Sequence, residues 1–208
     1  MRVQLRLATD QTHEEYVKQR GWERANLARC PAHPGGGCGM RVHTSYLRKR
    51  PPGVWIRRYY CRKARQTFSL LPDFAACGLS ADLAEVEAAV SAAEGSRSIA
   101  EAARTLRPEL LDERHAARWV RRRLERLRAA LLAVVTLVPA LSGCPPTLGA
   151  LRHALGVAEV LRGLRAVAEP LLASLNAPLG FVRRALRRRA GRRGRQHKAG
   201  PDPPLEGE

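Results

Sequence analysis

The sequence predicts an α+β fold, in which a small β-rich N-terminal part precedes a mainly α-helical part. Apolar and polar residues alternate over residues 1–9, which is the period of a strand. The stretch Cys30–Pro72 combines three cysteines with a glycine run and a short aromatic segment, a composition typical of turns and short strands. From Ser80 onward, apolar residues recur every three or four positions, which is the period of a helix.

These changes of character divide the 208 residues into three segments. We expect a β-rich domain over residues 1–79 and a helical region over residues 80–182. Residues 183–208 form a tail in which arginines follow one another without an acidic residue as far as Lys198. Because like charges at this density repel one another, we expect the tail to be disordered.

A strand over residues 1–9 and a short helix over residues 12–21 are expected at the N-terminus, packed beside the cysteine-containing stretch. Thr12 and Glu15 have the spacing of a capping box at the start of that helix. Gly21 is a typical residue to end it.

The cysteine-containing stretch predicts a hairpin with a cysteine-bearing turn on each side. Cys30 and Cys38 enclose a Pro/Gly-rich turn, and Cys61 directly follows a short aromatic segment. Two prolines and a glycine separate the expected strands Arg41–Leu47 and Val54–Cys61. This order of turn, hairpin and turn is the outline of a zinc ribbon, whose metal is held by four cysteine or histidine ligands in a tetrahedron.

The same stretch resembles the N-terminal zinc-ribbon region of bacterial insertion-sequence transposases and of short transposase-like proteins. The matching residues are Cys30-Pro31, Cys38-Gly39, Arg58-Tyr59-Tyr60-Cys61 and Thr67-Phe68-Ser69. The resemblance covers roughly residues 20–79, and it implies a zinc-binding module that takes part in DNA recognition.

The sequence departs from that family at the fourth metal ligand. The resemblance implies a cysteine or histidine three or four positions after Cys61, but Ala64 and Arg65 stand there and neither binds zinc. His33 is one replacement, because it follows Cys30 at the spacing of a metal-binding turn, and His43 is another. The expected zinc ligands are Cys30, His33, Cys38 and Cys61. The alternatives are a ribbon that has lost its metal, and three cysteines with no common role.

Four helices are expected in the helical region. Their ranges are 82–94, 99–106, about 112–138 and about 147–168. Ser80 is expected to cap the first helix, and Ser98 the second, with Glu101 at the capping-box position.

The second and third helices have the proportions of a helix-turn-helix, and they weakly resemble the helix-turn-helix segments that follow zinc ribbons in transposases. In that arrangement the third helix would lie in the major groove. The linker 107–113 is longer than the tight turn of that motif. The alternative is an ordinary bundle, because apolar residues alternate by three and four along the third helix. We expect this seam, Ala117 to Val138, to pack on the helix over about 147–168.

The charge of the chain points to nucleic acid as the partner. The sequence contains 37 Lys+Arg against 19 Asp+Glu, a formal net charge of +18, and its pI is near 11.2. A surplus of this kind attracts phosphates. The expected nucleic-acid contacts are Arg48, Lys49, Arg50, Arg57, Arg58, Arg62, Lys63, Arg118, Arg121, Arg122 and Arg126.

We expect a DNA-binding protein related to the DNA-recognition part of insertion-sequence transposases, and not an enzyme. Transposases cut DNA with three carboxylates that hold metal ions. Here Glu159 and Glu169 are the only acids between Glu125 and Asp202, which leaves no ligand set for a nuclease domain. One alternative is a helical protein-interaction module with a solvated basic face. The other is an RNA-binding zinc ribbon that stacks bases on Tyr59 and Tyr60.

The sequence also predicts a cytoplasmic protein without a membrane segment. Five cysteines at spacings unlike those of disulfide frameworks favour a reducing compartment. The chain opens without an apolar run, so no signal peptide is expected. The apolar run Ala129–Val138 is too short to cross a bilayer.

Overall fold

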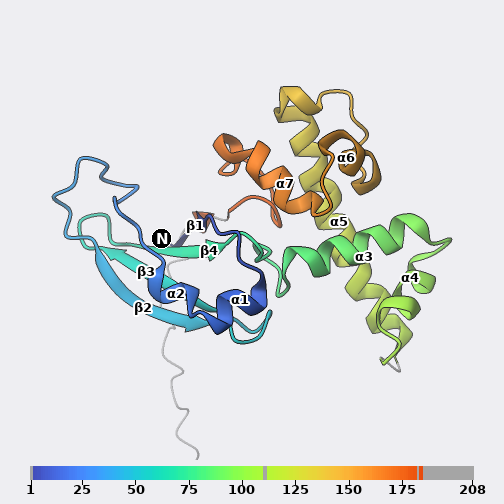
Figure 1. The fold of residues 1–208 in the computed structure, drawn as a ribbon, viewed down its shortest axis with the longest axis horizontal. Coiled ribbons are helices and arrows are strands. Elements are labelled where there is room, and N and C mark those ends of the chain that lie inside the picture. The colour runs from blue at the N-terminus through green and yellow to red at the C-terminus, as the bar shows by residue number, and fades with distance from the viewer. Residues whose placement is uncertain (1, 110–111, 182, 185–208) are drawn as a thin grey trace, which may run out of the picture.

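The computed structural model describes residues 2–109, 112–181 and 183–184. The fold is α+β, as the sequence predicts. A sheet lies on one side of the molecule, and the helices that follow it in the chain gather on the other side (Figure 1). The predicted disordered tail lies outside the described residues, apart from Arg183 and Arg184.

The sheet has the strand order β2-β3-β4-β1-β5. β2, β3 and β4 form an antiparallel meander, whereas β1 pairs in parallel with β4, so that Val3 lies opposite Phe68. The strands are β1 Arg2–Leu7, β2 Arg41–Leu47, β3 Trp55–Cys61, β4 Gln66–Pro72 and β5 Arg183–Arg184. The expected strands over residues 1–9, 41–47 and 54–61 are therefore confirmed, with small differences at their ends.

Strand β4 was not expected from the sequence. It lies between β3 and β1, and its residues from Phe68 to Pro72 are all buried. A strand that is covered on both faces carries an apolar run without the alternation that marks a half-exposed strand. The pairing of β1 with β4 also confirms that the N-terminal segment packs beside the cysteine-containing stretch.

The N-terminal helix starts as expected and ends earlier. α1 (His13–Lys18) has the predicted capping box, in which the Thr12 hydroxyl accepts from the Glu15 N–H and the Glu15 carboxylate accepts from the Thr12 N–H. The prediction that Gly21 ends this helix is wrong, because Gly21 begins the next one, α2 (Gly21–Arg24). Gly21 is required there by space, since a Cβ would lie 2.3 Å from the ring of Tyr16.

The remaining helices form the other half of the molecule. They are α3 Leu83–Gly95, α4 Ile99–Leu106, α5 Glu113–Leu137, α6 Leu148–Leu155 and α7 Val160–Val167, with the 3-10 turns η1 Pro139–Leu141 and η2 Glu169–Leu171. The Ser98 cap of α4 is confirmed, since its hydroxyl accepts from the Glu101 N–H. The expected capping box is not formed, because the Glu101 carboxylate accepts from the Arg97 N–H and not from the Ser98 N–H. The Ser80 cap is wrong: Asp82 caps α3 by accepting from the Glu85 N–H.

The prediction of a single helix over about 147–168 is wrong, because two short helices lie there. Gly156 takes a left-handed backbone conformation, with φ of +63°, and ends α6. α7 then begins at Val160 in a new direction, which allows both short helices to pack against α3. Glycine at the left-handed position after a helix is a common stop signal.

The apolar seam of α5 is buried, and more helices cover it than expected. Val120, Leu127 and Leu131 have no exposed surface. α5 has its most extensive contacts with α3 and α4, which precede it, and residues of α6 and α7 share the same core, so the prediction of packing on the following helix describes only part of the surroundings of the seam. The main core includes residues from the sheet, such as Ile56 and Leu71, as well as residues from the helices.

A buried arginine joins the end of the sheet to the last helix. Arg165 on α7 has no exposed surface, and its guanidinium donates to the carbonyls of Asp73, Pro178 and Leu179 at 2.6, 2.8 and 3.0 Å. Burial lowers the pKa of Arg165 to about 10, so the group stays charged at neutral pH. Arg165 therefore donates to three carbonyls at once, and the Pro178 carbonyl also accepts from the Cys77 N–H at 3.1 Å.

Candidate metal centre

Cys30, His33, Cys38 and Cys61 come together in the structure and lie close enough to hold a metal ion. One ligand atom from each residue lies within 4.8 Å of all the others. The three cysteines are buried, and His33 is partly exposed. Two of the cysteines and the histidine come from the loop between α2 and β2, and Cys61 is the last residue of β3.

A tight turn holds Cys30 and His33 on the same side of the loop. The two residues form an isolated antiparallel bridge, and the His33 N–H donates to the Cys30 carbonyl at 3.0 Å. The Gly36 N–H donates in turn to the His33 carbonyl at 3.0 Å. As a result, the His33 Nδ1 lies 3.8 Å from the Cys30 Sγ and 3.5 Å from the Cys61 Sγ.

The glycines that follow bring Cys38 back to the same place. Gly36 and Gly37 both take positive φ values, +85° and +67°. Two consecutive left-handed residues reverse the direction of the chain, and side-chain-bearing residues adopt this conformation only at a cost. The loop therefore needs glycine here for its backbone conformation, because open space surrounds both positions.

The turn between β3 and β4 supplies the fourth side of the cluster. The Ala64 N–H donates to the Cys61 Sγ at 3.3 Å. The position at which the family resemblance implies a fourth ligand thus contributes a backbone N–H to a sulfur. Arg65, the next residue, is exposed and has a φ of +51°, which lets the chain turn into β4.

The thiols of Cys30 and Cys61 differ in how readily they lose a proton. Burial raises the pKa of the Cys30 thiol, and its contacts with the Cys38 and Cys61 sulfurs raise it further. Burial acts in the same direction on Cys61. Donation from the Ala64 N–H and from the other two thiols outweighs this effect, and the pKa of Cys61 falls below its ordinary value. The Cys61 thiol therefore loses its proton more readily than the Cys30 thiol.

The distances within the cluster suit tetrahedral coordination. Zn–S and Zn–N bonds of about 2.3 and 2.05 Å at tetrahedral angles place a sulfur and a nitrogen about 3.6 Å apart. The two sulfur–nitrogen distances to His33, 3.5 and 3.8 Å, lie on either side of this value. Four protein donors also complete the coordination shell, which is typical of structural metal sites.

The structure decides between the two candidate histidines. His43 lies on β2, and its ring packs against Tyr60 with the ring centroids 5.7 Å apart. His33 is the histidine that joins the three cysteines. The remaining cysteines, Cys77 and Cys144, lie outside the cluster.

The predicted nucleic-acid contacts fall into two groups. Arg48, Arg57 and Arg58 are partly buried and contact the protein itself. Arg48 donates to the carbonyls of Ala76 and Leu79 at 3.1 and 2.9 Å, and burial lowers its pKa. The exposed group is Lys49, Arg50, Arg62, Lys63, Arg118, Arg121, Arg122 and Arg126.

The contacts of Arg57 and Arg58 are also internal. Arg57 donates to the carbonyls of Trp22 and Glu23 at 3.3 and 2.6 Å. The Arg58 guanidinium lies 4.0 Å from the centre of the Tyr46 ring. We therefore leave these two residues and Arg48 out of the proposed DNA contacts.

Tyr59 offers no ring surface for stacking a base. Its side chain is buried, and its hydroxyl lies 3.2 Å from the Ala25 carbonyl and 3.2 Å from the Asn26 Oδ1. Only Tyr60, which is partly exposed, remains of the expected stacking pair. The RNA-binding hypothesis therefore keeps only one of its two expected stacking residues.

Sequence reasoning did not single out Arg107 and Trp119 as functional candidates. Both line a pocket together with Arg50, Arg122 and Arg126, three of the predicted nucleic-acid contacts. Trp119, Arg122 and Arg126 share one face of α5 at helical spacing, whereas Arg50 and Arg107 come from other segments, so no local pattern brings all five together. The sequence feature that could have pointed to this pocket is the excess of arginine over acidic residues in α5.

The comparisons with known proteins assign the chain to no family. No protein-family model, curated protein or solved structure matches it. Among the described residues, every helix is either too short or too polar for a bilayer crossing. The functional assignment therefore depends on the cluster of four donors and on the distribution of charge.

Proposed function

We propose that this protein is a DNA-binding protein whose metal centre holds a structural zinc ion. The observation that carries the proposal is the convergence of the ligand atoms of Cys30, His33, Cys38 and Cys61 within 4.8 Å of one another. Three thiols and one imidazole are a donor set typical of structural zinc. Their burial and number favour a structural ion over one that binds substrate.

The metal would act on DNA binding through the turn that follows Cys61. Arg62 and Lys63 are exposed in this turn, directly beside a proposed ligand. A zinc ion that fixes Cys61 would also fix the two basic side chains next to it. Preordered cations lose less conformational entropy on meeting a phosphate.

α5 supplies the second group of proposed contacts. Arg118, Arg121 and Arg122 are exposed on this helix, while its apolar seam faces the protein interior. We propose that these arginines contact DNA, in an arrangement related to the helix-turn-helix segments that follow zinc ribbons in insertion-sequence transposases. The protein would then be a recognition module of a mobile element, without a nuclease activity of its own.

One alternative is weakened by the burial of the α5 seam. A protein-interaction module that uses this seam needs its apolar residues to be accessible. Leu124, Leu127 and Leu131 are already covered by other parts of the same chain. DNA binding is therefore the better-supported hypothesis.

The first experiment measures zinc per chain together with DNA affinity. We expect about one zinc per chain in the wild-type protein and none in Cys61→Ala, because the remaining three donors hold zinc less tightly. Cys144→Ser is the matched control, since this cysteine lies outside the cluster. A folded, metal-free wild-type protein would contradict the zinc assignment.

Salt dependence tests the DNA assignment. With about six phosphate contacts, duplex affinity should fall roughly a thousandfold between 50 and 200 mM salt. Replacing Arg118, Arg121 and Arg122 with glutamate should weaken binding further and reduce the salt slope by about three. Unchanged DNA affinity in that triple variant would exclude α5 from the interface.

A further inference from the structure

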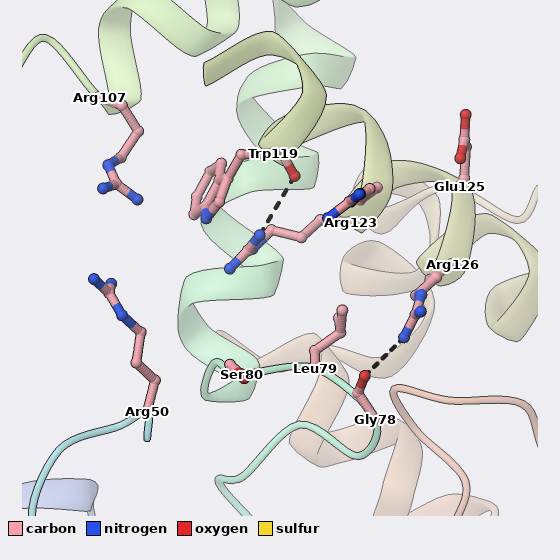
Figure 2. A pocket seen from close by; sticks show the side chains of 10 residues that line it. Arg50, Gly78, Leu79, Ser80, Arg107, Trp119, Arg123, Glu125 and Arg126 are labelled. Atoms are coloured by element: carbon pink, nitrogen blue, oxygen red, sulfur yellow. Dashed lines mark hydrogen bonds between the residues drawn. The ribbon is translucent and has the colours of Figure 1, made fainter. Parts of the chain in front are cut away.

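A pocket of about 810 Å³ lies where the helices meet the loops of the sheet (Figure 2). Four separate segments line it: the β2–β3 connection, the β4–α3 connection, the end of α4, and one side of α5. The lining arginines are Arg50, Arg107, Arg122, Arg123 and Arg126. The convergence of five cations from distant parts of the chain needs an explanation, because like charges repel one another.

Carboxylates only partly balance these arginines. Glu125 lines the pocket, Glu85 pairs with Arg123, and the exposed Glu109 pairs with Arg107. Five arginines thus face three carboxylates among the described residues. The pocket keeps a positive excess that suits an anionic ligand.

Trp119 holds two of the guanidinium groups in place. The Arg123 Cζ lies 3.7 Å from the centre of the Trp119 ring, and the Arg107 Cζ lies 5.1 Å from it. Figure 2 shows Arg107 and Arg50 pointing toward one another across the open side of the pocket. Arg126 is fixed by donation to the Gly78 carbonyl at 2.7 Å. Arg107, Arg123 and Arg126 are therefore ordered before any ligand arrives.

Arg123 provides a buried donor that the protein leaves unused. Its side chain is only 8 % exposed, yet its Nε has no hydrogen-bond partner among the described residues. Its other nitrogens contact Glu85 and the Trp119 carbonyl. Burial lowers the pKa of Arg123, and the positive charges of Arg107 and Arg50 act in the same direction. An unpaired buried donor in a native protein often marks a place where a ligand or water binds.

Arg50 and Arg122 complete the site from the solvent side. Both are exposed, and in the described part of the chain neither guanidinium makes a hydrogen bond or ion pair with the protein. A guanidinium presents a planar fork of donors that matches two oxygens of a phosphate. The guanidinium groups of Arg50 and Arg122, beside the ordered arginines of the pocket, are suited to hold one phosphate group.

We propose that this pocket is a phosphate-binding site and that its occupant is a backbone phosphate of DNA. The inference rests on the proposed function for the identity of the occupant, while the preference for phosphate follows from the pocket itself. It places a DNA contact at the junction between the sheet and the helices. Arg50 of the β2–β3 connection and Arg122 of α5 would grip the same phosphate group.

The test separates phosphate binding from DNA binding by using two probes. Calorimetry measures the affinity for inorganic pyrophosphate at constant ionic strength, and fluorescence anisotropy measures the affinity for a labelled DNA duplex. The variant is Arg50→Gln/Arg122→Gln. The matched control is Lys18→Gln/Arg128→Gln, which removes the same charge from exposed positions that do not line the pocket. Circular dichroism verifies the fold of both.

We expect the pocket variant to bind both probes roughly tenfold more weakly or worse, and the control to change both much less. Wild-type protein that binds pyrophosphate through Arg50 and Arg122 but fails to bind duplex would support the phosphate site and overturn DNA as its occupant. If the variant and the control bind both probes equally, the pocket proposal fails. In that case, duplex binding by the wild-type protein would leave the proposed function standing.

Discussion

The cysteine-containing loop and the helical region gain their order in different ways. Between α2 and β2 the chain has no helix or extended strand. Its shape depends on turns, on the approach of Cys30 and Cys38 to Cys61, and on a small apolar cluster against which Leu27 and Met40 pack. In the helical region, α5 buries residues such as Leu127 and Val134 in a core shared with other helices and the sheet. If the proposed zinc binds, a few ligand donors and a small apolar cluster organise the short loop, whereas the helices need burial spread over many residues.

The largest expected effect comes from removing the proposed zinc ion. A chelator should release the order of the loop and of the β3–β4 turn, because structural zinc contributes about 10 kcal/mol in small metal-dependent modules. Hydrogen exchange should then become fast at the amides of Gly36 and Ala64. The amides in the middle of α5 should stay protected.

That result depends on the two regions being stabilised independently. If the helices lose protection at the same chelator concentration as the loop, the comparison is wrong and the metal supports the whole molecule. Cys144→Ser provides the reference, since it leaves all four ligands in place.

Arg165→Met tests whether the helical region depends on apolar burial alone. The change removes the donors to three carbonyls and should lower the free energy of unfolding by about 4 kcal/mol. Urea unfolding measures this difference. The exposed Arg128→Met should change the stability by less than about 0.5 kcal/mol. If Arg165→Met and Arg128→Met lower the free energy of unfolding equally, the hydrogen bonds of Arg165 do not stabilise the fold.

Two neighbouring leucines of α5 measure the contribution of burial directly. Leu131 is 0 % exposed and Leu132 is 58 % exposed. Leu131→Ala should lower the free energy of unfolding by about 3 kcal/mol through lost contacts and a cavity. Leu132→Ala should have an effect within about 0.5 kcal/mol of zero. Equal effects would mean that α5 packs with a different face from the one described.

The smallest effect concerns the start of α3. Asp82→Ala removes the cap that accepts from the Glu85 N–H, and it should cost about 1 kcal/mol in thermal or urea unfolding. Ser80→Ala, at the position expected from the sequence, should be nearly neutral. A larger loss of stability in Ser80→Ala than in Asp82→Ala would mean that Ser80 is the cap.

The success of sequence reasoning at the metal centre follows from short spacings and distinctive residue types. Cys30 and His33 lie in one turn, and the glycines before Cys38 indicate the reversal that brings it back. The choice of His33 over His43 could not be made from spacing alone. It depended on where β2 and β3 place the ring of His43.

Local patterns failed where two signals competed within a few residues. Ser80 and Asp82 are both residue types that cap helices well, and Asp82 is the cap because it directly precedes the first turn of α3. Gly156 was overlooked because apolar residues continue at helical spacing on both sides of it. Periodicity reports which face is apolar, but it does not report a change in direction.

The sequence by itself determined the three cysteines of the candidate metal centre, the capping box at Thr12, the N-cap at Ser98, and the excess of positive charge. These features depend on residues that are close in the chain or on simple sums over it. Only the tertiary structure decided that β1 pairs with β4 and that Arg165 serves three carbonyls. It alone placed Arg50 near Trp119. Contacts of this kind join segments far apart in sequence, and they form only when the whole chain buries its apolar surface together.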